Sequence, residues 1–121
     1  MGEKGYKHLR VWEKANEYAL AVYQATRKFP REELYGVTSQ IRRAALSVAV
    51  NIVEGQASSS KKDFLNFLNI SNRSLVESEY LLEFSKDLAY LSDFDYELLE
   101  AKRREAGLLL TAFIRGVRAK L

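Results

Sequence analysis

The sequence predicts an all-α protein that folds as an antiparallel up-down-up-down four-helix bundle. Its 121 residues include one proline and six glycines, the residue types that helix interiors tolerate least. Apolar residues recur at steps of three and four through four stretches, which is the spacing of one helix face. Alternating apolar and polar runs, typical of strands, are almost absent. We therefore expect one bundle domain over residues 1–121, because chains of this length form one domain and short connections favour antiparallel neighbours.

Two helices are predicted in the first half of the chain, over residues 9–28 and 34–55. Pro30 separates them, because the residue before a proline is disfavoured in the α conformation. The apolar stripe of the first helix includes Trp12, Ala15, Ala19 and Val22, and that of the second includes Leu34, Val37, Ile41, Val48 and Ile52. Small residues around Ala44 and Ala45 are expected to let a neighbouring helix approach closely.

Two further helices are predicted over residues 61–90 and 93–119, and each begins at a capping box. Ser60 precedes Asp63 by three residues, and Ser92 precedes Asp95 in the same way. In this arrangement the serine oxygen accepts a bond from a free backbone amide of the first turn. The third helix also carries a polar strip beside its apolar seam, formed by Ser71, Ser74 and Ser78. Such a strip indicates hydrogen bonds between helices or a second interface in an oligomer.

The composition excludes several classes of function. The chain has no cysteine and a single histidine, His8, which excludes disulfides, thiolate metal sites and most histidine-based catalysis. No phosphate-binding glycine loop occurs, and no apolar run approaches the length of a membrane span. We therefore expect a cytoplasmic protein with no enzymatic activity, no catalytic residue, no metal, no cofactor and no membrane partner.

The net charge of +3, from 19 basic and 16 acidic residues, is small, but the predicted topology concentrates it. In an up-down bundle, the starts of the first and third helices share one end with the finishes of the second and fourth. That end, called the basic pole below, collects Lys4, Lys7, Arg10, Lys61, Lys62, Arg115, Arg118 and Lys120. Its functional interpretation is a surface that contacts nucleic-acid phosphates. The alternative is that lysine and arginine simply favour helix C-termini and solvated tails.

Arg42 and Arg43 form a second candidate site, midway along the second helix. Adjacent helical positions point about 100° apart, so one arginine flanks the core and the other faces outward. One interpretation is a contact to nucleic acid or to a neighbouring subunit. The alternative is an ion pair within the chain, to Glu77 or Glu79 of the third helix.

Four segments carry a family resemblance that extends over about residues 6–120. They are Tyr6–Ala15 (YKHLRVWEKA), Tyr35–Ala45 (YGVTSQIRRAA), Asn51–Gly55 (NIVEG) and Ser60–Leu68 (SKKDFLNFL). Together they resemble the four helix bundle protein family, also called the 23S rRNA intervening sequence protein family. The polar or small members of these motifs that we single out are Ser39, Gln40, Asn51, Glu54 and Gly55. Relatives often have proline at the position of Ala49, so the second helix is expected to run here without a kink.

The resemblance implies a bacterial four-helix bundle that assembles as a ring-like homopentamer and has no known catalysis. It also implies similarity in fold to the accessory protein of diversity-generating retroelements, which binds nucleic acid and works with a reverse transcriptase. Our first hypothesis is a homo-oligomeric accessory or scaffold protein that binds RNA or DNA. The alternative is a protein–protein adaptor that partners a reverse transcriptase. The many aromatic residues independently predict more apolar surface than one small bundle can bury.

Overall fold

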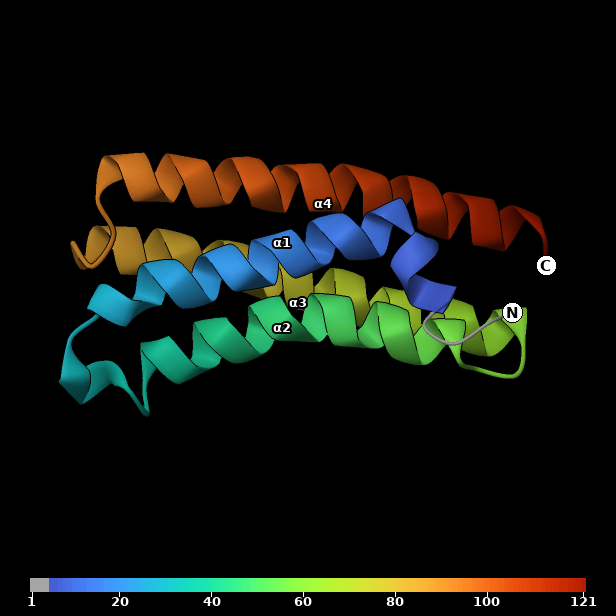
Figure 1. The fold of residues 1–121 in the computed structure, drawn as a ribbon, viewed down its shortest axis with the longest axis horizontal. Helices are drawn as coiled ribbons and strands as arrows, with labels where there is room; N and C mark the ends of the chain where they lie inside the picture. Colours follow the sequence, from blue (N-terminus) through green and yellow to red (C-terminus); the bar gives the residue numbers. More distant parts are fainter. Residues whose placement is uncertain (1–4) are drawn as a thin grey trace.

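The computed structural model describes residues 5–121, which form four long α-helices (Figure 1). The helices are α1 (Arg10–Ala25), α2 (Val37–Gln56), α3 (Lys61–Asp87) and α4 (Asp93–Ala119). Three short 3-10 helices accompany them: η1 (Gly5–His8), η2 (Thr26–Lys28) and η3 (Arg31–Glu33). The predicted all-α class is confirmed, and α2 runs through Ala49 as one continuous helix.

The helices pack as an up-down bundle, as predicted. Each helix contacts the next one in the chain, and α4 closes the arrangement against α1. Figure 1 shows that the start of α1, the end of α2, the start of α3 and the end of α4 lie at the same end of the bundle. Among residues 5–121, no helix is both long and apolar enough to cross a membrane.

Three of the predicted helix boundaries are wrong by a few residues. The first helix ends at Ala25 and continues only as the 3-10 turn η2. The second begins at Val37, because η3 and the non-helical backbone of Gly36 occupy the preceding segment. The third ends at Asp87 rather than near residue 90. Both serine caps are confirmed: the Ser60 hydroxyl accepts from the Asp63 amide at 3.1 Å, and that of Ser92 from Asp95 at 3.0 Å.

The end of α3 is closed by a Schellman motif built on an alanine. Ala89 adopts a left-handed conformation with φ 63°, the one non-glycine residue of the described chain with positive φ. The Tyr90 amide donates to the Ser85 carbonyl at 2.9 Å, and the Ala89 amide donates to that of Lys86 at 2.8 Å. These bonds satisfy carbonyls that would otherwise lack partners at the helix end. Glycine usually occupies this position, so its absence hid the helix end from the sequence prediction.

Ala89→Gly is expected to stabilise the protein by up to about 1 kcal/mol. The change removes the strain of a left-handed alanine, which costs roughly 1–2 kcal/mol. Part of this gain is offset because glycine increases the conformational entropy of the unfolded chain. The shift of the urea midpoint measures the effect. Ala101→Gly, at an exposed position inside α4, is the matched control and is expected to cost about 1 kcal/mol. A loss of stability in both variants would contradict the assigned backbone strain.

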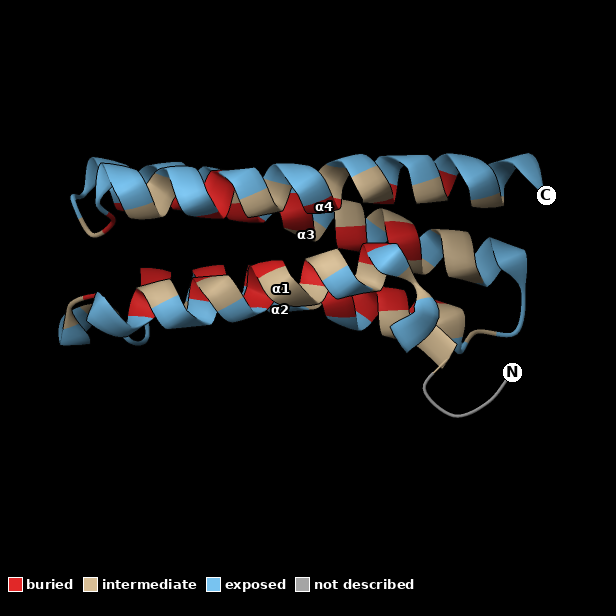
Figure 2. Ribbon diagram, turned by 45° about the horizontal axis from the view of Figure 1, so that its top comes forward, coloured by how far each residue is buried: buried red, intermediate tan, exposed pale blue. Residues whose placement is uncertain are grey.

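Buried residues face inward from all four helices (Figure 2). The largest fully buried side chains include Tyr18 of α1, Ile41 of α2, Leu82 of α3 and Leu110 of α4. Removing this apolar surface from water is the main source of stability for such a bundle. The buried face therefore follows the predicted three- and four-residue spacing of the apolar stripes.

The serines of α3 form hydrogen bonds between helices, as the polar strip predicted. Ser71 donates to the Val48 carbonyl of α2 at 2.7 Å, and the hydroxyls of Ser47 and Ser74 lie 2.8 Å apart. Ser78 accepts from the Tyr18 hydroxyl at 2.7 Å, which links α3 to α1 across the core. Because buried hydroxyls are costly unless bonded, these contacts fix how the helices are placed against each other.

Candidate nucleic-acid interface

The structure brings the described members of the basic pole to one end of the bundle. Lys7 lies in η1 and Arg10 opens α1, while Lys61 and Lys62 form the first turn of α3. Arg115, Arg118 and Lys120 belong to the last turns of α4 or follow it directly. The remaining member, Lys4, lies outside the described residues. Three segments that are far apart in sequence therefore bring cations to this end of the bundle, where their backbones meet (Figure 1).

The described cations of the basic pole are exposed and are not neutralised by ion pairs. Within residues 5–121, none of them lies within 4.0 Å of a carboxylate oxygen in an ion pair. Two acidic residues at this end, Glu54 near the end of α2 and Asp63 in the first turn of α3, are exposed as well. The ion pairs of the described chain instead lie along the body of the bundle and at its other end, as between Lys28 and Asp95 at 2.9 Å. The pole therefore keeps its positive charge available to a ligand.

The Arg42 side chain forms hydrogen bonds within the chain, but not to a carboxylate, so the predicted ion pair with Glu77 or Glu79 is wrong. Its Nε donates to Thr26 Oγ1 at 2.7 Å, and Nη2 donates to the Tyr23 carbonyl at 3.3 Å. The guanidinium also lies over the Tyr23 ring, 4.9 Å from its centroid. The partners thus belong to the end of α1 and to η2, and not to α3. Arg42 ties the α1–α2 connection together, so it is a structural residue with little freedom to bind a ligand.

Arg43 is the arginine of the pair that faces outward, as the helical geometry predicted for one of the two. It is exposed and, within the described chain, forms no ion pair within 4.0 Å, so the alternative of a pair with Glu77 or Glu79 is wrong for it as well. Glu79 instead forms an ion pair with Arg103, with Oε2 and Nη2 3.3 Å apart. Arg43 and Glu77 line the same groove between α2 and α3, with a volume of about 520 Å³. Arg43 remains a candidate contact, separate from the basic pole.

The polar and small motif residues divide into structural and exposed ones. Ser39 donates to the Gly36 carbonyl at 3.1 Å in the first turn of α2, and Asn51 donates to the Ser47 carbonyl at 2.9 Å. Gly55 is buried where a Cβ atom would lie 2.7 Å from Cδ1 of Phe64, which explains the need for glycine. Gln40 and Glu54 are exposed on α2. The motif therefore contains residues that specify packing beside residues available to partners.

A charged cluster that sequence analysis missed lies between α3 and α4. Glu100 is only 7% exposed and accepts two bonds from Arg103, at 2.7 and 2.8 Å. The hydrogen bonds from Arg103 hold the pKa of the Glu100 carboxyl below its ordinary value, against the opposing effect of burial. Burial also raises the pKa of the nearby Tyr18 hydroxyl. The three-residue spacing of Glu100 and Arg103 was the available signal, but it is shared by many exposed helical pairs.

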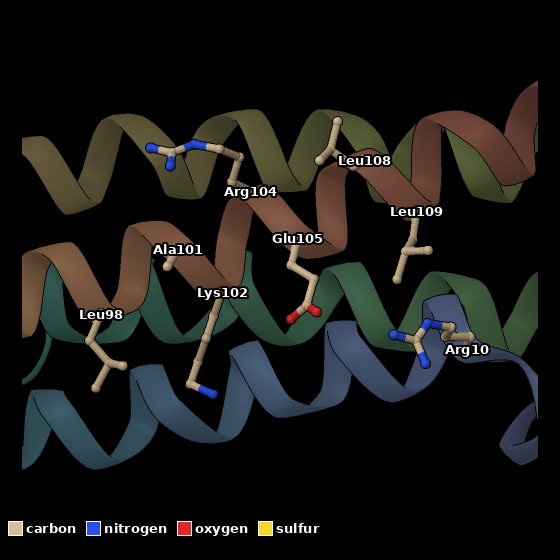
Figure 3. A pocket seen from close by; sticks show the side chains of 8 residues that line it. All are labelled: Arg10, Leu98, Ala101, Lys102, Arg104, Glu105, Leu108 and Leu109. Atoms are coloured by element: carbon tan, nitrogen blue, oxygen red, sulfur yellow. The ribbon is translucent and has the colours of Figure 1, made fainter.

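A groove with a volume of about 640 Å³ runs between α1 and α4 (Figure 3). Its lining residues are Arg10, Leu98, Ala101, Lys102, Arg104, Glu105, Leu108 and Leu109. Figure 3 shows Lys102 and Glu105 pointing toward α1, whereas Arg104 points to the opposite side of α4. Exposed Leu98 and Leu108 give the groove an apolar character that suits a protein partner better than a phosphate chain.

A smaller slot lies within the basic pole, where the start of α3 meets the end of α4. Lys61 and Phe64 line it from α3, α4 contributes Ala112, Phe113, Gly116 and Val117, and Lys120 follows directly after α4. Its volume is about 320 Å³. Within residues 5–121, no three side chains of the His, Cys, Asp and Glu types gather as a metal site. The slot was not predicted, because it depends on which faces of α3 and α4 meet.

A known protein family and a solved structure match nearly the whole bundle. A model of the family described as 23S rRNA-intervening sequence protein matches residues 7–112. One similar solved structure is a protein of unknown function from the S23 ribosomal protein family of Bacteroides thetaiotaomicron VPI-5482. It is 29% identical with a TM-score of 0.80, and the match covers 87% of this chain and 95% of that chain. No curated protein sequence matches the chain.

Proposed function

The chain belongs to the 23S rRNA-intervening sequence protein family, and we propose that it is a non-enzymatic, homo-oligomeric accessory or scaffold protein that binds nucleic acid through its basic pole. The observation that carries this proposal is the set of exposed cations that three chain segments place at one end, without ion-pair partners among the described residues. Phosphate contacts of this kind supply most of the affinity in sequence-independent binding. The ribosomal names of the family and of its solved relative make RNA the first nucleic acid to test.

Titration of a labelled structured RNA, and separately of a DNA duplex, tests the proposal. Binding is expected at about 50 mM salt and is expected to weaken at about 200 mM, because each engaged phosphate releases counterions. If all the described pole cations take part, the loss of affinity over this range is on the order of 10³-fold. Failure of the protein to bind either nucleic acid at the lower salt concentration would refute the proposal.

Self-association belongs to the same proposal, as a ring of five copies. Large apolar side chains stay exposed on all four helices, among them Tyr80, Phe94 and Leu108, which are 63%, 75% and 71% exposed. Monomeric proteins seldom leave large contiguous apolar patches uncovered, and head-to-tail contacts that close on themselves generate rings. Light scattering is expected to give about 70 kDa, five times the chain mass of 13.9 kDa. A mass of one chain at micromolar concentration would refute self-association.

A second candidate function is that of an adaptor for another protein, such as a reverse transcriptase. The groove between α1 and α4 favours it, because exposed Leu98 and Leu108 flank a mixed pair of charges, Lys102 and Glu105. Protein–protein interfaces combine apolar contacts of this kind with polar and charged groups. Co-purification of a reverse transcriptase that survives both nuclease and high salt would favour the adaptor over the nucleic-acid binder.

A further inference from the structure

We propose that the slot between α3 and α4 in the basic pole holds one unpaired nucleotide, with its base against Phe64 and Phe113 and its phosphates on Lys61 and Lys120. The inference rests on the proposed nucleic-acid binding and names the class of ligand: a single-stranded or flipped-out nucleotide rather than a continuous duplex.

The slot joins an aromatic lining to flanking positive charge. Phe64 and Phe113 are both partly exposed, and their rings meet edge to face with centroids 5.6 Å apart. Lys61 opens α3 and Lys120 directly follows α4, and both line the slot and are exposed. Among the described residues, no carboxylate lines the slot. A flat apolar ring attached to an anion complements this arrangement in both shape and charge.

The surroundings favour a nucleic acid over a small amphiphilic anion. A fatty acid or a lipid head group would use one or two cations, whereas further exposed cations, Lys62 and Arg118, lie at the same pole. A chain of regularly spaced phosphates can engage all of them together. In binding of single strands, bases stack on aromatic side chains while a basic surface follows the backbone.

The slot also predicts a preference between nucleic acids. A base inside a duplex is stacked and paired, so it can enter the slot only after it has been extruded at a cost of a few kcal/mol. An unpaired base carries no such cost. The protein is therefore expected to bind a single strand through slot and cations together, and a duplex through the cations alone.

Gly116→Leu fills the slot without disturbing the fold. Gly116 lines the slot, and a Cβ atom added there has no heavy atom within 4 Å. Leucine is also the better helix former, so the variant is expected to be at least as stable as the parent. Thr111→Leu is the matched control, because Thr111 is an exposed residue of α4 that does not line the slot. Circular dichroism verifies that both variants fold.

The experiment measures the affinity of each protein for a short oligouridine and for a blunt-ended RNA duplex. Gly116→Leu is expected to weaken oligouridine binding roughly 5- to 100-fold, the effect of losing one stacked base, and to leave duplex binding unchanged. Thr111→Leu is expected to change neither. Oligouridine binding that is unaffected by Gly116→Leu would overturn the slot while the proposed function stands. If the parent protein binds neither RNA, the proposed function itself fails. Binding to phosphatidylglycerol vesicles is measured for the same proteins. If Gly116→Leu weakens vesicle binding but leaves oligouridine binding unchanged, the slot belongs to a lipid and the inference is overturned.

Discussion

RNA binding is expected to fall steeply when Lys61, Arg118 and Lys120 are all replaced by glutamate. The three cations are exposed at the basic pole and form no ion pairs within the described chain. Each lost phosphate contact reduces the salt dependence of log K by about 1, so the slope is expected to fall by about 3 while new repulsion lowers the affinity further. Fluorescence anisotropy at several salt concentrations measures both quantities.

The matched control is the triple variant Arg27→Glu, Arg31→Glu and Arg73→Glu. Each replacement removes one positive charge and adds one negative charge, so both triple variants change the net charge from +3 to −3. The control cations are also exposed, but they lie in η2, in η3 and midway along α3. The control is expected to keep the salt slope of the parent. Equal losses in the two variants would mean that net charge, and not the basic pole, determines binding.

Glu100→Gln is expected to destabilise the bundle by about 3 kcal/mol. The change leaves Arg103, whose side chain is 14% exposed, with Glu79 as its one remaining charged partner, 3.3 Å away. Removing one partner of a buried ion pair typically costs about 3–5 kcal/mol, because the other charge stays buried. The urea midpoint is the measurement. Glu97→Gln, at an exposed position of the same helix, is expected to change stability by less than about 0.5 kcal/mol.

The same pair predicts how stability depends on pH. The pKa of Glu100 is lowered in the folded protein, chiefly by its hydrogen bonds from Arg103. Because its pKa is lower in the folded protein, Glu100 stabilises the fold at any pH above its ordinary pKa of 4.5. This stabilisation is lost as the pH falls through the pKa of the folded protein. Acid unfolding of the parent is therefore expected to include a step below pH 4.5 that Glu100→Gln lacks. Identical acid profiles would contradict a native salt bridge at this position.

The helices could be predicted well in their interiors and less well at three of their ends. Apolar spacing and the serine caps at Ser60 and Ser92 are local signals, so they are visible in sequence. The end of α3 depends on Ala89 in a left-handed conformation. Alanine disfavours this conformation, but the reversal of the chain at this point requires it. The start of α2 was placed too early because Leu34 continues the apolar spacing although its backbone precedes the helix.

The candidate site was predictable only where topology alone determines it. The basic pole followed from the order of the helices, because alternating helices bring known ends together. The partners of Arg42 could not be predicted from helix order, because Thr26 and Tyr23 reach Arg42 only through the packing of α1 against α2. The slot around Phe64 and Phe113 likewise depends on the rotation of two helices about their axes. Spacing within one helix does not specify that rotation.

Chemical footprinting of lysines with and without bound RNA tests most directly that the basic pole is the nucleic-acid interface. Acetylation followed by mass spectrometry compares the exposed lysines of the two ends in one experiment. We predict that RNA binding protects Lys61, Lys62 and Lys120 and leaves Lys28 and Lys86, at the other end, unchanged. Protection of Lys28 and Lys86, while the lysines of the basic pole stay reactive, would contradict this prediction.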